Sequence, residues 1–171
     1  MILTSLETVA YRVHVPRWSF VPTSGAGAAR FGGRLNRPGV AALYLSLDPG
    51  TALAEYQQLD DLLPPGLIVA YRIVIDRVVD FRGGYAAGWS PLWKDFYCDW
   101  RRMVFHERVE PPSWAMGDAV RAAGAKGILF RSTRVETGCN LTVFTEMLAG
   151  SDQLAVYDPQ RSLPVNQASW P

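Results

Sequence analysis

Residue types that bind charged ligands are concentrated between positions 24 and 55 of this 171-residue chain. A glycine-rich stretch leads to Gly33 and Arg34, an apolar run carries Tyr44, and Glu55 lies about two helical turns beyond Asp48. Glycines let backbone N–H groups approach a phosphate, and the arginine fork can grip two phosphate oxygens. A loop, a strand and a helix are therefore predicted to bring a cation, an aromatic ring and a carboxylate around one pocket.

Simpler explanations stay open for these residues. Arg34 could be a solvated arginine on an ordinary turn, since glycine mainly marks turns. Glu55 borders an apolar stripe, so it could equally be one half of a structural salt bridge. The glycine spacing matches neither the Rossmann fingerprint nor the Walker loop, so a nucleotide bound here would be bound by another fold.

The helix that carries Glu55 has a clear beginning. Asp48 is a good N-cap, Pro49 suits the first helical position, and the helix is predicted to continue to the prolines at 64–65. Periodicity predicts two more helices, at 91–107 and 113–123. Apolar and alternating runs predict strands at 8–15, 41–45, 67–75, 126–130, 139–147 and 153–157, with 76–81 as a continuation or a neighbour.

Polar residues also occur within or just after the predicted strands. Arg12 and His14 share one face of strand 8–15, so Arg12 is a candidate phosphate or ribose contact if that face lines a cleft, and is solvent-exposed otherwise. His14 has no companion ligand, so we expect it on the surface. Ser132 follows an apolar strand without a nucleophile-elbow pattern, which favours a hydrogen-bonding role over a hydrolase nucleophile. An ordinary turn serine is the alternative.

Composition limits the class of protein. The chain is 49% hydrophobic, which suffices for one domain, and we expect a core from about 8 to 157 with an irregular tail at 158–171. A net charge of +1 predicts no strong attraction to DNA or to a membrane. The only cysteines, Cys98 and Cys139, have no metal-ligand spacing, so no metal site is expected. Without a signal peptide or an apolar span, a soluble cytoplasmic protein is expected.

Several motifs, taken in order, resemble the RES domain, a family named for an arginine, a glutamate and a serine. They are Tyr11-Arg12-Val13, GAGAARFGGRLN at 25–36, Ala42-Leu43-Tyr44-Leu45, Ala52-Leu53-Ala54-Glu55, and GILFRSTR with GCNLTVF between 127 and 144. The resemblance covers nearly the whole chain. Leu35 departs from it, since the family pattern has tryptophan between the arginine and the asparagine.

The resemblance implies an α+β single domain with an ADP-ribosyltransferase-like mixed sheet and flanking helices. It implies the toxin of a type II toxin–antitoxin pair, with an Xre-like helix-turn-helix antitoxin, and NAD⁺ as substrate with no further cofactor. Residue by residue, the catalytic positions carried over are Arg34, Tyr44, Glu55 and Ser132. The NAD⁺-binding positions carried over are Arg12, Gly33, Arg34 and Asn140.

What accepts the ADP-ribose stays open. Some RES proteins degrade NAD⁺ by hydrolysis or phosphorolysis, and relatives transfer ADP-ribose to a protein. Cleavage of the nicotinamide–ribose bond creates an oxocarbenium-like centre, which Glu55 could stabilise while Arg34 holds the diphosphate. Tyr44 could stack on the nicotinamide and Ser132 could bind ribose or the carboxamide. A non-catalytic nucleotide- or partner-binding module is the remaining alternative, and it would not need Glu55.

Neutralisation by an antitoxin suggests a further expectation. Arginines are predicted around the pocket mouth, where they would attract an acidic or C-terminal carboxylate of the antitoxin. We expect the antitoxin, and not this chain, to bind DNA. The stripe Trp93, Tyr97 and Trp100 is a candidate toxin–toxin or toxin–antitoxin surface, with burial in the core as the alternative. The mouth arginines are Arg12, Arg30, Arg34, Arg37, Arg131 and Arg134.

Overall fold

The chain folds into an α+β single domain with one mixed sheet of six strands. The computed structural model describes residues 1–58 and 61–168. The strands are β1 (Leu3–His14), β2 (Leu43–Ser46), β3 (Leu67–Asp80), β4 (Gly127–Arg131), β5 (Cys139–Val143) and β6 (Gln153–Val156). The α-helices are α1 (Ala26–Phe31), α2 (Pro49–Gln57) and α3 (Pro112–Ala122). Short 3-10 turns lie at Pro16–Trp18, Pro91–Asp95 and Thr145–Met147, and a π-helix lies at Arg102–Glu107.

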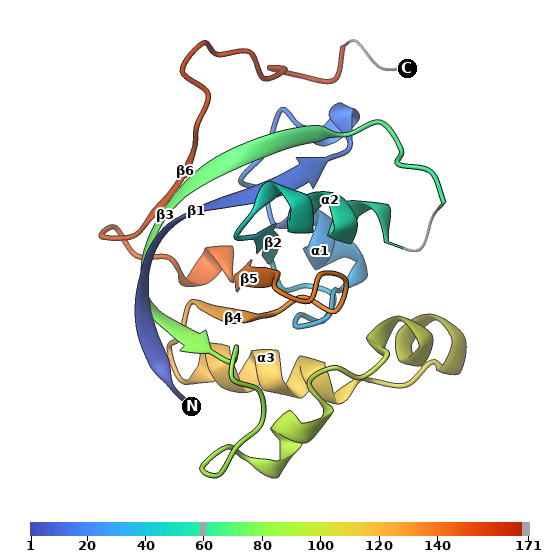
Figure 1. Cartoon of the computed structure of the whole chain (residues 1–171), viewed down its shortest axis with the longest axis vertical. Helices are drawn as coiled ribbons and strands as arrows, with labels where there is room; N and C mark the ends of the chain where they lie inside the picture. The colour runs from blue at the N-terminus through green and yellow to red at the C-terminus, as the bar shows by residue number, and fades with distance from the viewer. Residues whose placement is uncertain (59–60, 169–171) are drawn as a thin grey trace.

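Five of the strands form a closed ring. The strand order is β1-β2-β5-β4-β3-β6, and β1 also pairs with β3, so β1, β2, β5, β4 and β3 form a ring to which β6 is added. Within the described residues, β3 and β4 are the one parallel pair, and the other paired strands are antiparallel. The β1–β3 pairing is long, from Leu3↔Val79 to His14↔Leu67, whereas β1 and β2 are joined by the single pair Tyr11↔Ser46. Figure 1 shows α2 and α1 beside β2, and α3 at the opposite side of the sheet.

Two apolar clusters support this arrangement. One is drawn from the strands themselves and includes Leu43, Tyr71 and Leu141, each fully buried. The other lies between the sheet and α3, and its centre is Phe81, whose ring contacts those of Trp89, Trp93 and Phe96. Burial of these aromatic rings fixes the 81–111 segment, which connects β3 to α3.

The segment 91–107 is not the single helix that its periodicity predicts. It has a 3-10 turn at Pro91–Asp95, an irregular stretch, and the π-helix. Trp93 and Phe96 both pack on Phe81, and the carbonyls of Phe96 and Cys98 accept hydrogen bonds from Arg34. Tertiary contacts thus override the local preference for a helix.

Other boundaries also differ from prediction. The glycine-rich stretch contains α1, because alanines at 26, 28 and 29 favour a helical turn between the glycines. The Asp48 cap is confirmed, since its side chain accepts a hydrogen bond from Thr51 N at 2.7 Å. However, α2 ends at Gln57, where Gln58 takes a positive φ of 57°. Leu59 and Asp60, which the predicted helix included, lie outside the described residues.

Two of the remaining strands also differ from prediction in their extent. Segments 67–75 and 76–81 form the one strand β3, and the strand predicted at 139–147 ends at Val143 before a 3-10 turn. Residues 158–168 form no helix or strand, and 169–171 lie outside the described part. No helix in the described part has the length and apolar character needed to cross a membrane.

Candidate active site

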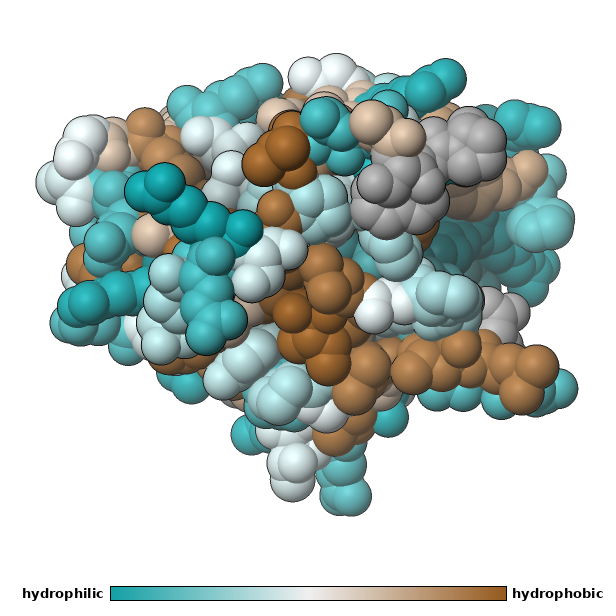
Figure 2. Space-filling model, turned by 90° about the horizontal axis from the view of Figure 1, so that it is seen from above, coloured by the Kyte–Doolittle hydropathy of each residue, from teal (hydrophilic) through white to brown (hydrophobic). Residues whose placement is uncertain are grey.

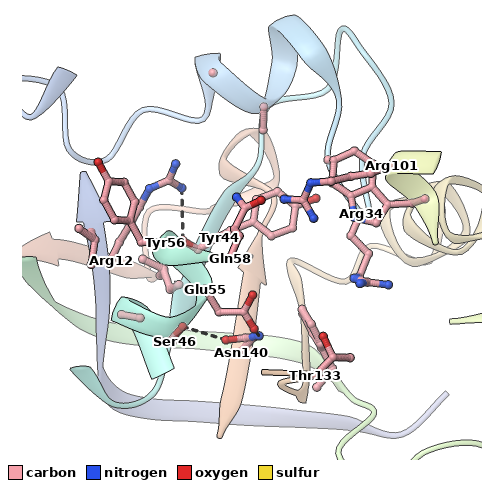
Figure 3. A pocket seen from close by; sticks show the side chains of 18 of the residues that line it. Arg12, Arg34, Tyr44, Ser46, Glu55, Tyr56, Gln58, Arg101, Thr133 and Asn140 are labelled. Carbon is pink, nitrogen blue, oxygen red and sulfur yellow. Dashed lines mark hydrogen bonds between the residues drawn. The ribbon is translucent and has the colours of Figure 1, made fainter. Parts of the chain in front are cut away.

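A pocket of about 380 Å³ opens beside the junction of β1 and β2. Its walls come from β1, β2, β5, α2, the segment from α1 to Arg34, and the residue pair Trp100-Arg101. Figure 3 shows Glu55 and Asn140 on one side of this space and the side chains of Arg34 and Arg101 on the other. Segments far apart in the sequence therefore contribute to one site.

The carboxylate of Glu55 is held by two hydrogen bonds to the same oxygen. Its Oε1 accepts from Ser132 Oγ at 2.7 Å and from Asn140 Nδ2 at 2.6 Å. Asn140 Oδ1 in turn accepts from Ser46 Oγ at 2.8 Å, which fixes the orientation of the amide. No described residue donates a hydrogen bond to Glu55 Oε2, so that oxygen is available to a ligand.

Local structure explains how these groups meet. The Asp48 cap sets the start of α2 and thereby the face on which Glu55 lies. Asn140 pairs with Ser46 across β2 and β5, and Ser132 directly follows β4. Ser132 Oγ accepts from the backbone N–H groups of Arg134 and Val135 at 3.0 and 3.3 Å, so its own hydrogen is directed to Glu55.

Arg34 is fixed at both its backbone and its side chain. Trp114 Nε1 donates to Gly33 O at 2.7 Å, and Ser113 Oγ donates to Arg34 O at 2.5 Å. The guanidinium Nη1 donates to Phe96 O and Cys98 O, each at 3.2 Å. Nη1 is thus bound to the protein, no described residue accepts a hydrogen bond from Nε or Nη2, and Arg34 lines the pocket.

Tyr44 presents its ring to the pocket while its hydroxyl holds the loop before β2. Oη donates to Asn36 Oδ1 at 2.7 Å and accepts from Leu35 N at 2.9 Å. Burial is the main cause that raises the pKa of Tyr44 above its ordinary value. At Gly33 an added Cβ would lie 2.5 Å from Tyr44 Oη, so this close approach requires glycine.

Arg12 is a half-buried cation at the pocket wall. Its Nη1 donates to Tyr44 O at 3.2 Å, and among the described residues it has no ion pair with a carboxylate. Burial lowers its pKa, which the nearby hydroxyl groups of Tyr71 and Tyr44 partly offset. An anion in the pocket would compensate this partly buried charge.

The predicted site residues come together in one place. Six of the seven line the pocket, and the seventh, Ser132, donates a hydrogen bond to Glu55. Ser46, Tyr56, Trp100, Arg101 and Thr133 also line it but were missed. Ser46 carries a sequence signal, since it lies two residues after Tyr44 and so on the same strand face. The six lining residues are Arg12, Gly33, Arg34, Tyr44, Glu55 and Asn140.

The predicted ring of mouth arginines is only partly correct. Arg12, Arg34 and Arg131 line the pocket, whereas Arg30, Arg37 and Arg134 do not. Arg37 binds Glu110 at 2.6 Å and Asp118 at 2.7 Å, and Arg30 lies over the ring of Phe31. Acidic residues on α3 and on the segment before it thus draw Arg37 away from the pocket.

His14 is buried, which contradicts the prediction of a surface histidine. It shares the inward face of β1 with the buried Ala10, and its Nε2 lies 2.6 Å from Tyr71 Oη. Because Tyr71 Oη donates to Pro22 O at 2.8 Å, Nε2 is the donor in this pair. Burial, together with the charge of Arg12, lowers the pKa of His14 to about 4.

The aromatic stripe is mostly core and not a partner surface. Trp93 and Trp100 are 3% and 8% exposed, and only Tyr97 is substantially open, at 42%. Exposed apolar residues occur instead after β1, at Val15, Trp18 and Val21. Figure 2 shows apolar side chains gathered in the middle of the face seen from above, between polar ones.

The described residues offer no metal centre, since they contain no cluster of three or more His, Cys, Asp and Glu side chains suited to hold an ion. The pocket lining presents carboxylate, hydroxyl, amide and guanidinium groups.

Comparison with known proteins identifies the family. A search of curated proteins gives no match. Among solved structures, a chain of the M. tuberculosis MbcT–MbcA toxin–antitoxin complex has the same fold, with a TM-score of 0.59 and 20% identity over 90% of this chain and 84% of that chain. The family model described as the RES domain matches residues 9–166. With most of its length covered by that match, the chain belongs to the RES domain family.

Proposed function

We propose that this chain is the toxin of a toxin–antitoxin pair and that it consumes NAD⁺ by cleaving the bond between nicotinamide and ribose. The observation that carries the proposal is the Glu55 carboxylate, held by Ser132 and Asn140 inside a pocket walled by arginines. Membership of the RES family supports it, as does the fold shared with a chain of a toxin–antitoxin complex. Such a toxin would act on the cytoplasmic NAD⁺ pool.

The arrangement suits a reaction in which positive charge develops on the ribose. As the nicotinamide leaves, an oxocarbenium-like centre forms, and a fixed carboxylate can stabilise it. Glu55 Oε2, with no hydrogen bond from a described residue, is the oxygen that would face the ribose. Nicotinamide departs as a neutral molecule and needs no general acid. This agrees with a pocket lining in which no described residue is a histidine.

The arginines of the pocket are suited to bind the diphosphate of NAD⁺. NAD⁺ carries a diphosphate, and guanidinium groups bind phosphate oxygens in pairs. Arg12 and Arg34 both line the pocket, and neither forms an ion pair with a described carboxylate. The ring of Tyr44, which lines the pocket, is suited to stack on the cationic nicotinamide before it leaves.

We further propose an Xre-like antitoxin as the partner. The crystal structure of MbcT is that of a complex with the antitoxin MbcA. In the present protein, the simplest neutralisation is a peptide end of the antitoxin that enters the pocket and places a carboxylate against its arginines. A complex in which the antitoxin stays away from Arg34 and Glu55 would contradict this.

The test of the activity is release of nicotinamide from NAD⁺ by the purified protein. Glu55→Gln keeps an oxygen for Ser132 and Asn140 but removes the charge, so we expect release to fall by about 10²- to 10³-fold. Glu146→Gln is the matched control, because Glu146 is exposed and lies outside the pocket. Absence of nicotinamide release by the wild type, with and without phosphate, together with no labelled protein product, would refute the proposal.

Two further readouts separate the alternatives. With radiolabelled NAD⁺ and cell lysate, hydrolysis or phosphorolysis yields only labelled small molecules, whereas ADP-ribosyl transfer labels a protein band. A non-catalytic binding module would leave growth inhibition unchanged in a folded Glu55→Gln variant. Loss of growth inhibition in that variant eliminates the binding module.

A further inference from the structure

Two neighbouring arginines at the start of the π-helix have different surroundings. Both are exposed to solvent, but Arg101 lines the pocket, whereas Arg102 lies outside the lining and binds Glu107 at 2.8 Å. Figure 3 shows the Arg101 side chain reaching from this segment into the pocket near Arg34. The sequence motifs give no reason to single out either arginine.

The position of Arg101 is built by its neighbours. Trp100 is 8% exposed and therefore anchors the segment, and the guanidinium carbon of Arg101 lies 4.6 Å from the centre of the Trp100 ring. Just upstream, Arg34 binds the carbonyls of Phe96 and Cys98. Arg34 thus holds the segment that delivers a second guanidinium beside its own.

Charged groups of both signs surround Arg101. Burial, and then the charges of Arg34 and Arg134, lower the pKa of Arg101, while Glu55 and Asp99 act in the opposite direction. Neither Arg101 nor Arg34 forms an ion pair with a carboxylate in the described part of the chain. Arg34 and Arg101 therefore repel each other, and an anion held between them would be attracted by both.

We propose that Arg101 is a second phosphate-binding residue, which together with Arg34 takes the diphosphate of a nucleotide substrate. Two guanidinium groups match two phosphoryl groups in charge and in donor geometry. Glu55 and Tyr44 occupy the part of the pocket that would receive the ribose and its leaving group. The inference rests on the proposed NAD⁺ chemistry for the identity of the substrate, but it concerns recognition of the diphosphate alone.

The direct test is ligand binding by calorimetry in phosphate-free buffer, with ADP, adenosine and inorganic phosphate as probes. Arg101→Gln should weaken ADP binding by about 10- to 100-fold, as expected for loss of a charged hydrogen-bonding group, and leave adenosine binding unchanged. Arg101→Lys should be intermediate, because it keeps the charge and loses the fork. Arg102→Gln removes the same charge one residue away and should bind ADP like the wild type.

Several results would overturn the assignment. The first is that Arg101→Gln and Arg102→Gln bind ADP with equal affinity. The second is that the wild type does not bind ADP. The third is that Arg101→Gln weakens the binding of inorganic phosphate but not that of ADP. Thermal melting shows whether the two variants are equally folded. If Arg101→Gln melts at a lower temperature than Arg102→Gln, Arg101→Lys is used in its place. If Arg101→Lys then binds ADP as tightly as the wild type does, the guanidinium fork of Arg101 does not bind the diphosphate.

A kinetic comparison separates this inference from the proposed activity. Arg101→Gln should lower kcat/KM for NAD⁺ but not for nicotinamide riboside, which has the same scissile bond and no phosphate. Nicotinamide release that is unaffected by Arg101→Gln with both substrates leaves the activity standing and refutes the role of Arg101. A wild type that releases no nicotinamide but binds ADP through Arg101 refutes the activity and retains the binding site.

Discussion

Gly117→Ala tests how tightly α3 holds the loop that carries Arg34. An added Cβ at Gly117 would lie 1.8 Å from Leu35 O, whereas close carbon–oxygen contacts in proteins are about 3.3 Å, so α3 and the loop must separate by roughly 1.5 Å. Overpacking of this kind costs about 1–3 kcal/mol, and the contact with rigid backbone favours the upper end. The higher helix propensity of alanine stabilises the fold by about 1 kcal/mol relative to glycine. We therefore expect a net loss of about 2 kcal/mol.

The assay is the free energy of unfolding in urea, with thermal melting as a second measure. A loss of this size corresponds to a melting temperature lower by about 4–8 °C in a chain of this length. Gly27→Ala is the matched control, because Gly27 is also in a helix but a Cβ there meets nothing within 4 Å, so a gain of up to about 1 kcal/mol is expected. Equal stability of Gly117→Ala and the wild type would refute the tight contact between α3 and Leu35.

Two further predictions follow from buried polar groups. Because the pKa of His14 is lowered to about 4 in the fold, the unfolded chain binds the extra proton between about pH 6.5 and 4, and stability should fall across that window by up to about 3 kcal/mol. His14→Gln should flatten the denaturation profile against pH, while His106→Gln, at an exposed position, should not; equal slopes would contradict the assignment. Tyr44→Phe leaves Leu35 N and Asn36 Oδ1 without the hydroxyl and should lower unfolding free energy by about 1–3 kcal/mol in urea. An unchanged midpoint would mean that the hydroxyl does not hold the loop.

Local signals sufficed for the part of the site that depends on α2. Asp48 and Pro49 fix where the helix starts, and the helical period then places Glu55 on the side that meets β5. The alternation of β2 likewise places Tyr44 and Ser46 on one face. These residues could be found from the sequence because their directions are set within a few residues.

The placements that failed depend on contacts between distant segments. Arg101 enters the pocket because Arg34 binds carbonyls at 96 and 98 and because Trp100 is buried, and no local pattern encodes these contacts. His14 is buried because β3 supplies Tyr71 as its partner. Arg37 is withdrawn by acidic residues more than seventy positions later, which only the packing of α3 brings near.

The single pair that joins β1 to β2 has a dynamic consequence. Tyr11 and Ser46 close the ring of strands, with the Arg12 side chain bridging to Tyr44 O beside them, whereas the β1–β3 ladder is eleven pairs long. Local opening at this junction breaks few hydrogen bonds, so its amides should exchange with solvent faster than those of the β1–β3 ladder. Because Arg12 also faces the pocket, an anion bound to it shifts the opening equilibrium of the junction. Occupancy of the pocket should thus be readable as a change in amide protection where β1 meets β2.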